Sequence, residues 1–202
     1  MTAAIRLVLF ARYPAPGAAK TRLIPALGPD GSAAVHRQLT ERTMAVLLAA
    51  GFPVELQYTG ASEAEFRAWL GEGFALVPQA EGDLTDRLLA ALHPAPVIFF
   101  GADTPDLTVD HVARAVAAME VHPVVLGAAD DGGYYLIGMK KPMPELLTEM
   151  PWSTDQVMPE TLRRLAALGI EPAVLETLHD CDRPEDLPRW PWLTDPWPVS
   201  AS

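Results

Sequence analysis

The sequence predicts a single α/β domain with a mostly parallel central sheet and helices on both faces. Three observations lead to this prediction. Short apolar runs alternate along the chain with segments of helical periodicity, which is the pattern of βαβ units. The run at 97–100 (VIFF) is wholly apolar, as in strands buried on both faces of a parallel sheet. Half of the 202 residues are hydrophobic, which is enough for one compact core.

Seven segments have the composition of strands. The last but one of them follows two aspartates and two glycines at 130–133, a sequence typical of tight turns. We therefore expect this strand to turn back antiparallel to its neighbour. The seven segments are residues 5–10, 54–58, 74–77, 97–101, 124–128, 134–139 and 172–176.

Helical periodicity is found between these strands. The segment 31–50 places Val35, Leu39 and Val46 on one face, and Gly51 follows as a C-terminal stop. Two shorter helices are expected at 62–70 and 83–92. A longer one is expected at 108–119, where apolar residues recur at i, i+3, i+7 and i+10.

A last helix is expected near residue 153. The sequence of residues 153–156 (STDQ) fits a capping box, which would open a helix that runs to Leu168 and ends before Gly169.

Charge, cysteine content and hydropathy limit the classes of function. The net charge of −11 disfavours nucleic acid as a partner, because duplex binding needs a broad basic surface. The single cysteine, Cys181, excludes an intrachain disulfide framework. No apolar segment approaches the ~20 residues of a membrane-spanning helix, and no N-terminal signal sequence is recognised. The default expectation is a soluble, cytoplasmic protein.

The C-terminal segment differs in composition from the rest of the chain. We expect one domain over residues 1–189, followed by a Trp- and Pro-rich tail at 190–202. The tail holds three of the five tryptophans, between prolines that prevent a continuous helix. We interpret it as packing against the domain or a second subunit, rather than as a ligand-binding element. A homodimer is therefore allowed.

A cationic loop follows the first strand. The first 29 residues carry a charge of +4 and the remainder −15, because Asp30 is the first acidic residue. Gly17 permits a close backbone approach, while Lys20 and Arg22 offer a point charge and a bidentate fork. An anion such as a nucleotide phosphate fits this loop, although a solvated surface loop accounts for the residues about equally well. The spacing matches neither a P-loop nor a dinucleotide fingerprint.

Two aspartates follow the strand with the strongest buried pattern. In open α/β sheets, ligands bind beyond the carboxyl ends of the strands. Asp103 is placed there, and Mg²⁺ usually uses one or two protein carboxylates together with substrate phosphates. We favour a metal ligand over a turn residue for Asp103. Asp106 is alternatively the N-cap of the following helix.

The turn at 130–133 is a third place where polar groups follow a strand. Its glycines would let a substrate approach the backbone, which makes Asp131, Gly133 and Tyr134 candidate ligand-binding residues. Taken alone, these residues are better explained as a plain hairpin turn.

The fourth segment follows the last strand. Asp182 precedes Pro184, which is placed near the first helical position, so Asp182 is either an N-cap or a second metal ligand. From the residues alone we favour the cap. His179 and Cys181 lack the partners of a zinc site, and no catalytic histidine is indicated for Cys181.

Four motifs occur in one order between residues 5 and 187. They are Arg12…Gly17-x-x-Lys20-Thr21-Arg22-Leu23, Gly101-x-Asp103-x-Pro105-x-Leu107, Asp130-Asp131-Gly132-Gly133-Tyr134-Tyr135-Leu136-Ile137-Gly138 and Asp182-x-Pro184-Glu185-Asp186-Leu187. The set resembles the bacterial "transferase 1" family that is associated with radical-SAM and selenodomain genes. That family belongs to the nucleotide-diphospho-sugar transferase (GT-A) superfamily.

The resemblance implies a Rossmann-like GT-A or nucleotidyltransferase domain with a nucleotide at the first loop. It implies Mg²⁺ (or Mn²⁺) on Asp103 and Asp182, since Asp182 matches the first Asp of an Asp-Thr-Pro-Glu-Asp-Leu segment in CMP-sugar synthetases. Arg183 replaces the threonine of that segment. The implied nucleotide-binding residues are Ala11, Arg12, Gly17, Lys20 and Arg22.

The resulting hypothesis is a Mg²⁺-dependent transferase with a nucleotide-activated donor. Nucleotidyl transfer from an NTP to a small phosphorylated or hydroxyl acceptor is preferred, because three cations suit a triphosphate. Lys20, Arg22 and Asp103 would carry the catalysis, mainly by positioning and electrostatics. Asp131, Gly133 and Tyr134 would line the acceptor side. Glycosyl transfer from a nucleotide-diphospho-sugar is the first alternative. A non-catalytic nucleotide-binding module is the second.

Overall fold

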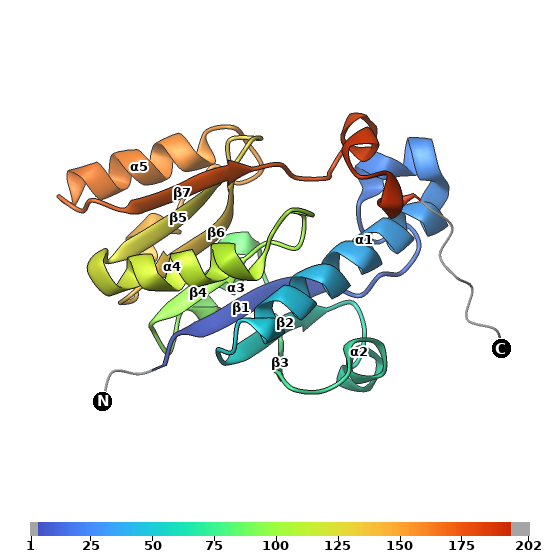
Figure 1. Ribbon diagram of the computed structural model, residues 1–202, viewed down its shortest axis with the longest axis horizontal. Coiled ribbons are helices and arrows are strands. Elements are labelled where there is room, and N and C mark those ends of the chain that lie inside the picture. The colour runs from blue at the N-terminus through green and yellow to red at the C-terminus, as the bar shows by residue number, and fades with distance from the viewer. Residues whose placement is uncertain (1–3, 195–202) are drawn as a thin grey trace.

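A seven-stranded sheet forms the centre of the structure, a computed structural model that describes residues 4–194 (Figure 1). The strand order is β3-β2-β1-β4-β6-β5-β7. All neighbouring strands pair in parallel except β6, which is antiparallel to both β4 and β5, as its turn sequence predicts. The strands are β1 (Arg6–Arg12), β2 (Val54–Thr59), β3 (Ala75–Pro78), β4 (Val97–Phe100), β5 (Val124–Ala129), β6 (Tyr134–Met139) and β7 (Ala173–Leu178).

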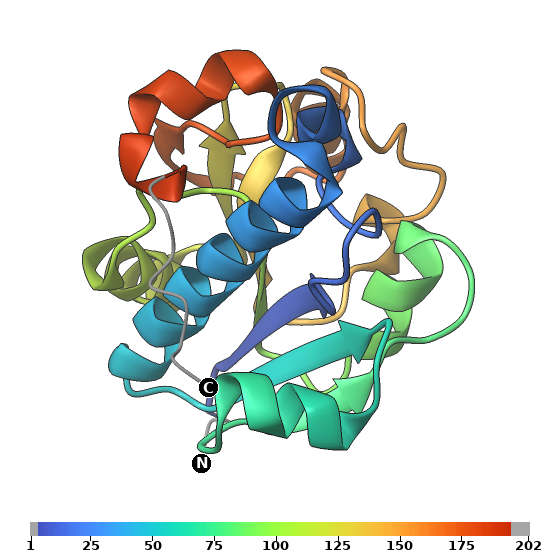
Figure 2. The ribbon, with the colours of Figure 1, turned by 90° about the vertical axis from the view of Figure 1, so that its right-hand side faces the viewer.

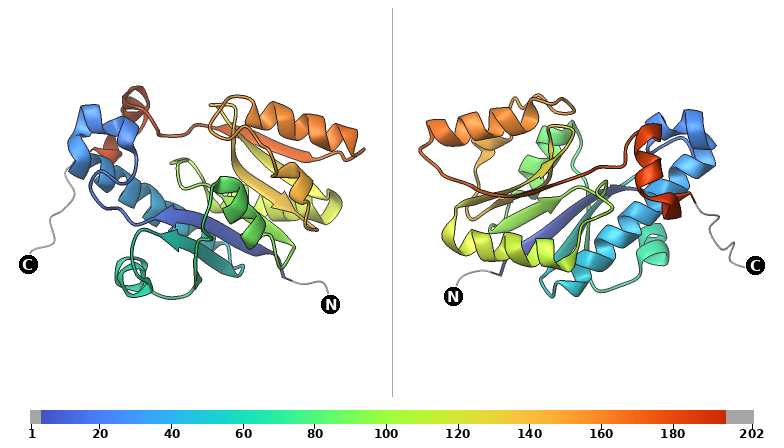
Figure 3. Two further views of the ribbon diagram at one scale, coloured as in Figure 1. Left: turned by 180° about the vertical axis from the view of Figure 1, so that it is seen from behind. Right: turned by 45° about the horizontal axis from the view of Figure 1, so that its top comes forward.

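Helices cover both faces of this sheet, which confirms the predicted fold class (Figures 1 and 3). On one face, Leu47 and Val112 pack in a core cluster with residues of β1, β2 and β4. On the other face, Leu88 and Leu165 pack against β4, β5 and β6. The α-helices are α1 (Ile24–Ala49), α2 (Glu63–Leu70), α3 (Leu84–Ala91), α4 (Val109–Val121) and α5 (Val157–Ala167). Short 3₁₀ helices are η1 (Thr21–Leu23), η2 (Pro144–Leu146), η3 (Pro184–Arg189) and η4 (Pro191–Leu193).

The first helix begins earlier than the sequence predicts. α1 starts at Ile24 instead of residue 31, and Gly28, with φ 69° and ψ 173°, interrupts its helical geometry near the start. The predicted stops are confirmed, because Gly51 and Gly169 follow α1 and α5 with φ of 78° and 67°. Such left-handed backbone at the end of a helix favours glycine.

The predicted capping box at 153–156 is wrong. α5 begins at Val157, and its N-cap residue Gln156 makes no side-chain cap. The Thr154 hydroxyl instead donates to the Pro151 carbonyl (2.7 Å) and accepts from the Gln156 N–H (3.2 Å). Ser153 adopts φ 62°, so the segment forms a turn and not a helix entry.

The N-cap alternative for Asp106 is also wrong. Thr108 caps α4, and its hydroxyl accepts from the His111 N–H at 3.5 Å. The Asp106 carboxylate accepts instead from the indole N–H of Trp190 at 3.0 Å. This contact connects the loop after β4 with the C-terminal 3₁₀ helices.

The described part of the predicted tail packs against the start of α1. Figure 2 shows the red segment of η3 and η4 next to the blue start of α1. Trp190 and Leu193 are buried in a third cluster that includes Leu23 and Leu39. Residues 195–202 of the predicted tail lie outside the described residues. Between residues 4 and 194, no helix has both the length and the apolar character needed to cross a membrane.

The parallel topology brings distant motifs to one edge of the sheet. β1, β4, β5 and β7 run in the same direction, so the segments that follow them leave the sheet at its carboxyl edge. These segments are the loop 13–20, the segment 101–107, the turn 130–133 and the segment 179–183. The fold thereby places all four sequence motifs at that edge.

Candidate active site

The loop after β1 is held in one conformation by α1. Gly17 and Lys20 both have left-handed backbone, with φ of 77° and 49°. The fully buried Ser32 of α1 has its Oγ 2.8 Å from the Ala19 carbonyl oxygen and 2.6 Å from that of Lys20, and its one hydroxyl proton is shared between them. A non-glycine residue adopts positive φ at a cost, and the Ser32 contacts compensate for it at Lys20.

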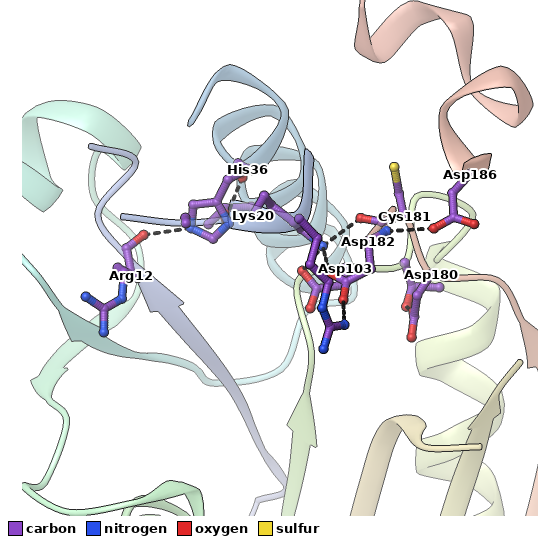
Figure 4. A network of polar contacts seen from close by, with 12 residues as sticks. Arg12, Lys20, His36, Asp103, Asp180, Cys181, Asp182 and Asp186 are labelled. Carbon is purple, nitrogen blue, oxygen red and sulfur yellow. Dashed lines mark hydrogen bonds and ion pairs between the residues drawn. The ribbon is translucent and has the colours of Figure 1, made fainter. Parts of the chain in front are cut away.

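Lys20 is the centre of a charge cluster built from three of the motifs (Figure 4). Its ammonium donates to Asp103 Oδ1 at 2.7 Å, to Asp182 Oδ1 at 2.9 Å and to the Cys181 carbonyl at 2.7 Å. Burial would lower the pKa of Lys20, but the two carboxylates outweigh it and raise the pKa above its ordinary value. The ammonium is therefore charged at neutral pH, although its side chain is only 3% exposed.

Asp182 accepts from a second cation. The Arg22 guanidinium donates to Asp182 Oδ2 at 2.7 Å. Burial would raise the pKa of Asp182, but Lys20 and Arg22 hold it below its usual range. Asp182 is thus ionised, and the interpretation of this residue as an N-cap is wrong, because Arg183 is the N-cap of η3 and Pro184 follows at the first position.

The backbone fixes the separation of the two carboxylates. The Cys181 N–H donates to the Asp103 carbonyl at 2.8 Å, which joins the segment after β7 to the segment after β4. The carboxylate of Asp186 accepts from the N–H groups of Asp182 (3.0 Å) and Arg183 (2.8 Å). Asp103 and Asp182 therefore sit on a hydrogen-bonded frame, with side chains 47% and 40% exposed.

His36 contributes a neutral wall beside the cluster. Burial lowers the pKa of His36, and its Nε2 lies 2.9 Å from the Arg12 carbonyl. The neutral ring donates its Nε2–H to that oxygen. Figure 4 shows the Arg12 guanidinium directed away from Lys20. Arg12 is thus a cation at the rim, while Lys20 is buried at the centre.

Three connected pockets surround the cluster, and Asp131 and Ser153 line all three. The cationic cleft, about 510 Å³, is lined by Arg12, Ala18, Ala19, Lys20, Thr21, Arg22, His36, Asp103, Asp131, Ser153 and Asp182. The acidic chamber, about 330 Å³, is lined by Arg22, Asp130, Asp131, Ser153, Thr154, Asp155, Asp180, Asp182, Arg183 and Asp186. The apolar chamber, about 340 Å³, is lined mainly by residues of β4, β6 and α3.

The structure brings most of the predicted site residues together. Arg12, Lys20, Arg22, Asp103 and Asp182 all line the cationic cleft.

Two predicted nucleotide-binding residues do not line that cleft. Ala11 is buried in β1, and its carbonyl accepts from the Gln79 amide at 3.3 Å. Gly17 shapes the loop but is not among the residues that line the cleft. The three acceptor-side residues, Asp131, Gly133 and Tyr134, line the apolar chamber.

Sequence reasoning missed several residues of the site. Ser32 and His36 lie one turn apart on the buried face of α1, which also carries Val35 and Leu39. Polar residues on an otherwise apolar helix face are the signal that would have identified them.

Asp180 was missed as well. It accepts from the Thr104 hydroxyl at 2.6 Å, and burial, together with the charges of Asp103 and Asp131, raises its pKa to about 7.

The oxygen ligands of the site suit a hard cation. Within residues 4–194, no group of three or more His, Cys, Asp or Glu side chains is arranged to hold a metal ion. Asp103 and Asp182 offer two carboxylates at the cleft, and Mg²⁺ commonly relies on so few, with substrate phosphates completing its shell. His179 pairs with Asp130, and burial raises the pKa of the Cys181 thiol to about 11.

Solved structures with the same fold bind nucleotides or are named as transferases. A Desulfovibrio desulfuricans G20 protein, provisionally assigned as a nucleotide-diphospho-sugar transferase, is 27% identical with a TM-score of 0.83. That similarity covers 89% of this chain and 82% of the other. A CMP:2-keto-3-deoxy-manno-octonic acid synthetase in complex with CTP is 16% identical, with a TM-score of 0.53 over 93% and 96% of the two chains. No curated protein matches the chain.

A third structure contains a metal. Rv0371C from Mycobacterium tuberculosis H37Rv, in complex with manganese, is 17% identical, with a TM-score of 0.54 over 93% and 97% of the two chains. The fold and these similarities support a nucleotide-using transferase with a GT-A-like domain, in agreement with the resemblance in the sequence. The chain belongs to the family described as an uncharacterized protein conserved in bacteria (DUF2064), which matches residues 42–154.

Proposed function

We propose that the protein is a nucleotidyltransferase that transfers a nucleoside monophosphate from an NTP to a small acceptor. One observation carries this proposal. The loop after β1 delivers Lys20 and Arg22 to two carboxylates that come from the segments after β4 and β7. Two cations and two carboxylates that could bind a metal ion thus lie together at the carboxyl edge of the sheet, where open α/β sheets bind their ligands.

The residues at this edge fit a divalent cation. Asp103 and Asp182 would hold Mg²⁺ or Mn²⁺ together with nucleotide phosphates, and the bound ion supplies neutralisation of the charge on the reacting phosphate. The manganese complex of the Mycobacterium tuberculosis relative supports this assignment.

The charges of the chain determine how a nucleotide is bound. Lys20 and Arg22 balance Asp103 and Asp182, so the cluster has no net charge of its own. When phosphates occupy the cleft, Lys20 and Arg22 exchange carboxylate oxygens for phosphate oxygens. Arg12, whose guanidinium points away from Lys20, adds a third cation at the rim (Figure 4).

The transfer itself needs no covalent enzyme intermediate. The acceptor oxygen forms a bond to the α-phosphorus, and the bond between that phosphorus and the bridging oxygen breaks. The electron pair leaves with pyrophosphate, whose charge Lys20 and Arg22 stabilise. Asp131, which lines both the cationic cleft and the apolar chamber, accepts the proton of the attacking hydroxyl.

Glycosyl transfer is the second candidate. The name of the Desulfovibrio desulfuricans relative favours it, since that protein is assigned to sugar-nucleotide chemistry. In that reaction an acceptor attacks the anomeric carbon, and a nucleoside diphosphate leaves. Arg12, at the rim of the cleft that Lys20 and Arg22 also line, favours the triphosphate, because three cations and a divalent ion match its larger charge.

The leaving group separates the two reactions. We expect purified protein with Mg²⁺ or Mn²⁺, a panel of NTPs and mixed cell metabolites as acceptors to release pyrophosphate, measured by a coupled phosphate assay. Asp103→Asn should lower the release at least about 100-fold, whereas Asp110→Asn, at an exposed position of α4, should not change it. Nucleoside diphosphate release from sugar nucleotides would support the second candidate. Tight nucleotide binding without any product would contradict both.

A further inference from the structure

The apolar chamber is built mainly from aromatic and aliphatic side chains. Phe10 and Phe99 stack as a tilted pair with ring centroids 5.8 Å apart, and Tyr134 meets Trp152 edge to face at 6.2 Å. The chamber's about 340 Å³ is enough for a small organic molecule. Its lining residues are Phe10, His36, Leu84, Leu88, 99–103, Asp131, 133–137, 152–154 and Val157.

The chamber adjoins the cationic cleft. His36, Asp103, Asp131 and Ser153 line both spaces. A molecule in the chamber can therefore reach Asp103, the one carboxylate of the charge cluster that lines the chamber, and the α-phosphate of a nucleotide would be placed beside it. The body of such a molecule contacts the aromatic walls, and its reactive group meets the donor.

The charges around the chamber disfavour an anion. No lysine or arginine lines it in the described part of the chain, and His36 is held neutral by burial. Asp103 and Asp131 stand at its mouth, and the acidic chamber next to it is lined by six aspartates and two arginines. A phosphate ester in this chamber would lose hydration without gaining a cation.

The walls are also a poor match for a nucleobase. A base presents several donors and acceptors along its edge, and each costs free energy when it is buried without a partner. Phe10, Phe99 and Leu88 of the lining pack well against an apolar body and make no hydrogen bonds. The hydrogen-bonding side chains of the lining include Tyr134, Ser153 and Thr154, which are fewer than the apolar ones.

On the basis of the proposed function, we propose that the apolar chamber holds the acceptor and selects a neutral hydroxyl compound with an apolar body. The hydroxyl would lie at Asp131 and Asp103, where it can attack the donor. This narrows the acceptor class that the sequence leaves open, because it excludes phosphorylated acceptors.

Binding of two simple alcohols without nucleotide tests this proposal. The probes are 2-phenylethanol and hexan-1-ol, compared with 2-phenylethyl phosphate and measured by saturation-transfer NMR titration. The variant is Leu84→Glu, in the chamber wall at the start of α3, and the matched control is Leu162→Glu on α5. The two leucines are 39% and 38% exposed, so neither substitution disturbs a buried core position.

We expect both alcohols to bind the unmodified protein and the control, and to bind Leu84→Glu roughly tenfold more weakly. The phosphate ester should bind at least about tenfold more weakly than its alcohol. The proposal is overturned if neither alcohol binds, if Leu84→Glu and the control behave alike, or if the ester binds as tightly as the alcohol. Displacement of the alcohols by a nucleoside without phosphates would place the base in the chamber and also overturn it.

These outcomes are independent of the proposed transfer reaction. Pyrophosphate release without alcohol binding would contradict the assignment of the chamber as the acceptor site and leave the proposed nucleotidyltransferase activity in place. Alcohol binding without any nucleotide turnover would contradict the proposed nucleotidyltransferase activity, and with it the role of the chamber as an acceptor site.

Discussion

Replacement of Lys20 by methionine removes the buried cation of the charge cluster and retains a long apolar stem. Truncating one member of a fully buried ion pair typically lowers the free energy of unfolding by roughly 3–5 kcal/mol, because the remaining charge is buried without a partner. Here the remaining carboxylates are 47% and 40% exposed, and Arg22 still contacts Asp182. Water can therefore solvate them, and the main loss is the hydrogen bond to the Cys181 carbonyl.

This reasoning gives a destabilisation of about 2 kcal/mol for Lys20→Met. For a domain of this size, that corresponds to a fall in Tm of roughly 4–8 °C. Arg22→Gln is the matched control, since the Arg22 side chain is 55% exposed and contacts the same Asp182. We expect Arg22→Gln to lower the free energy of unfolding by no more than about 1 kcal/mol, as for other surface ion pairs. Urea unfolding at pH 7 measures both values.

The same variant should bind a divalent cation differently. Without the ammonium, Asp103 and Asp182 lose the positive charge that they share, so Mn²⁺ alone should raise the Tm of Lys20→Met more than that of the unmodified protein. Turnover should nevertheless fall, because the cation at the departing phosphate is lost. A Lys20→Met protein as stable as the Arg22→Gln control, with an unchanged response to Mn²⁺, would refute the account of the cluster.

Three further predictions follow from named contacts. Asp103→Asn should lower metal-dependent turnover at least about 100-fold, because the charge of the carboxylate is lost. It should lower the Tm by only a few degrees, since the side chain is 47% exposed. Loss of the fold in circular dichroism would contradict this prediction. Burial lowers the pKa of His36, so its contribution to stability is complete above the unfolded value of about 6.5 and is lost as pH falls toward the folded pKa. His36→Gln should therefore flatten the fall in unfolding free energy between pH 7 and 5, and an unchanged slope in urea titrations would count against this cause. Gly132→Ala should destabilise far more than Gly169→Ala, because both have positive φ but only Gly132 would push a Cβ to within 2.5 Å of Asp155 Cα; similar Tm values would show that the turn can shift.

Much of the fold could be predicted because its signals are local. The apolar runs and the turn at 130–133 identified the seven strands and the reversed direction of β6. The capping box at 153–156 failed because residue types alone did not reveal that the Thr154 hydroxyl would bind the Pro151 carbonyl. The start of α1 was missed because Gly28 and Pro29 are normally helix breakers, yet here they follow a short first turn.

The candidate site was predictable as a set of segments, but its contacts were not. Asp103 and Asp182 come from segments after β4 and β7, so only the sheet order brings them near Lys20. The sequence predicted that Lys20 binds phosphate and that the two carboxylates bind a metal ion, as separate halves of a site. In the structure these groups neutralise one another, an arrangement that depends on the left-handed backbone of Lys20 and on the Ser32 hydroxyl.

This mutual neutralisation bears on the order of binding in the proposed reaction. A polyphosphate alone would meet two carboxylates beside its cations, and a divalent cation alone would meet Lys20 between its two ligands. Each ligand thus removes the repulsion that opposes the other, because the metal neutralises Asp103 and Asp182 while the phosphates take over Lys20 and Arg22. Such a coupling is reciprocal, so the nucleotide must tighten metal binding by the same factor by which the metal tightens nucleotide binding. We therefore expect an NTP and its cation, if the proposed reaction is correct, to enter the ion-paired cluster as one complex.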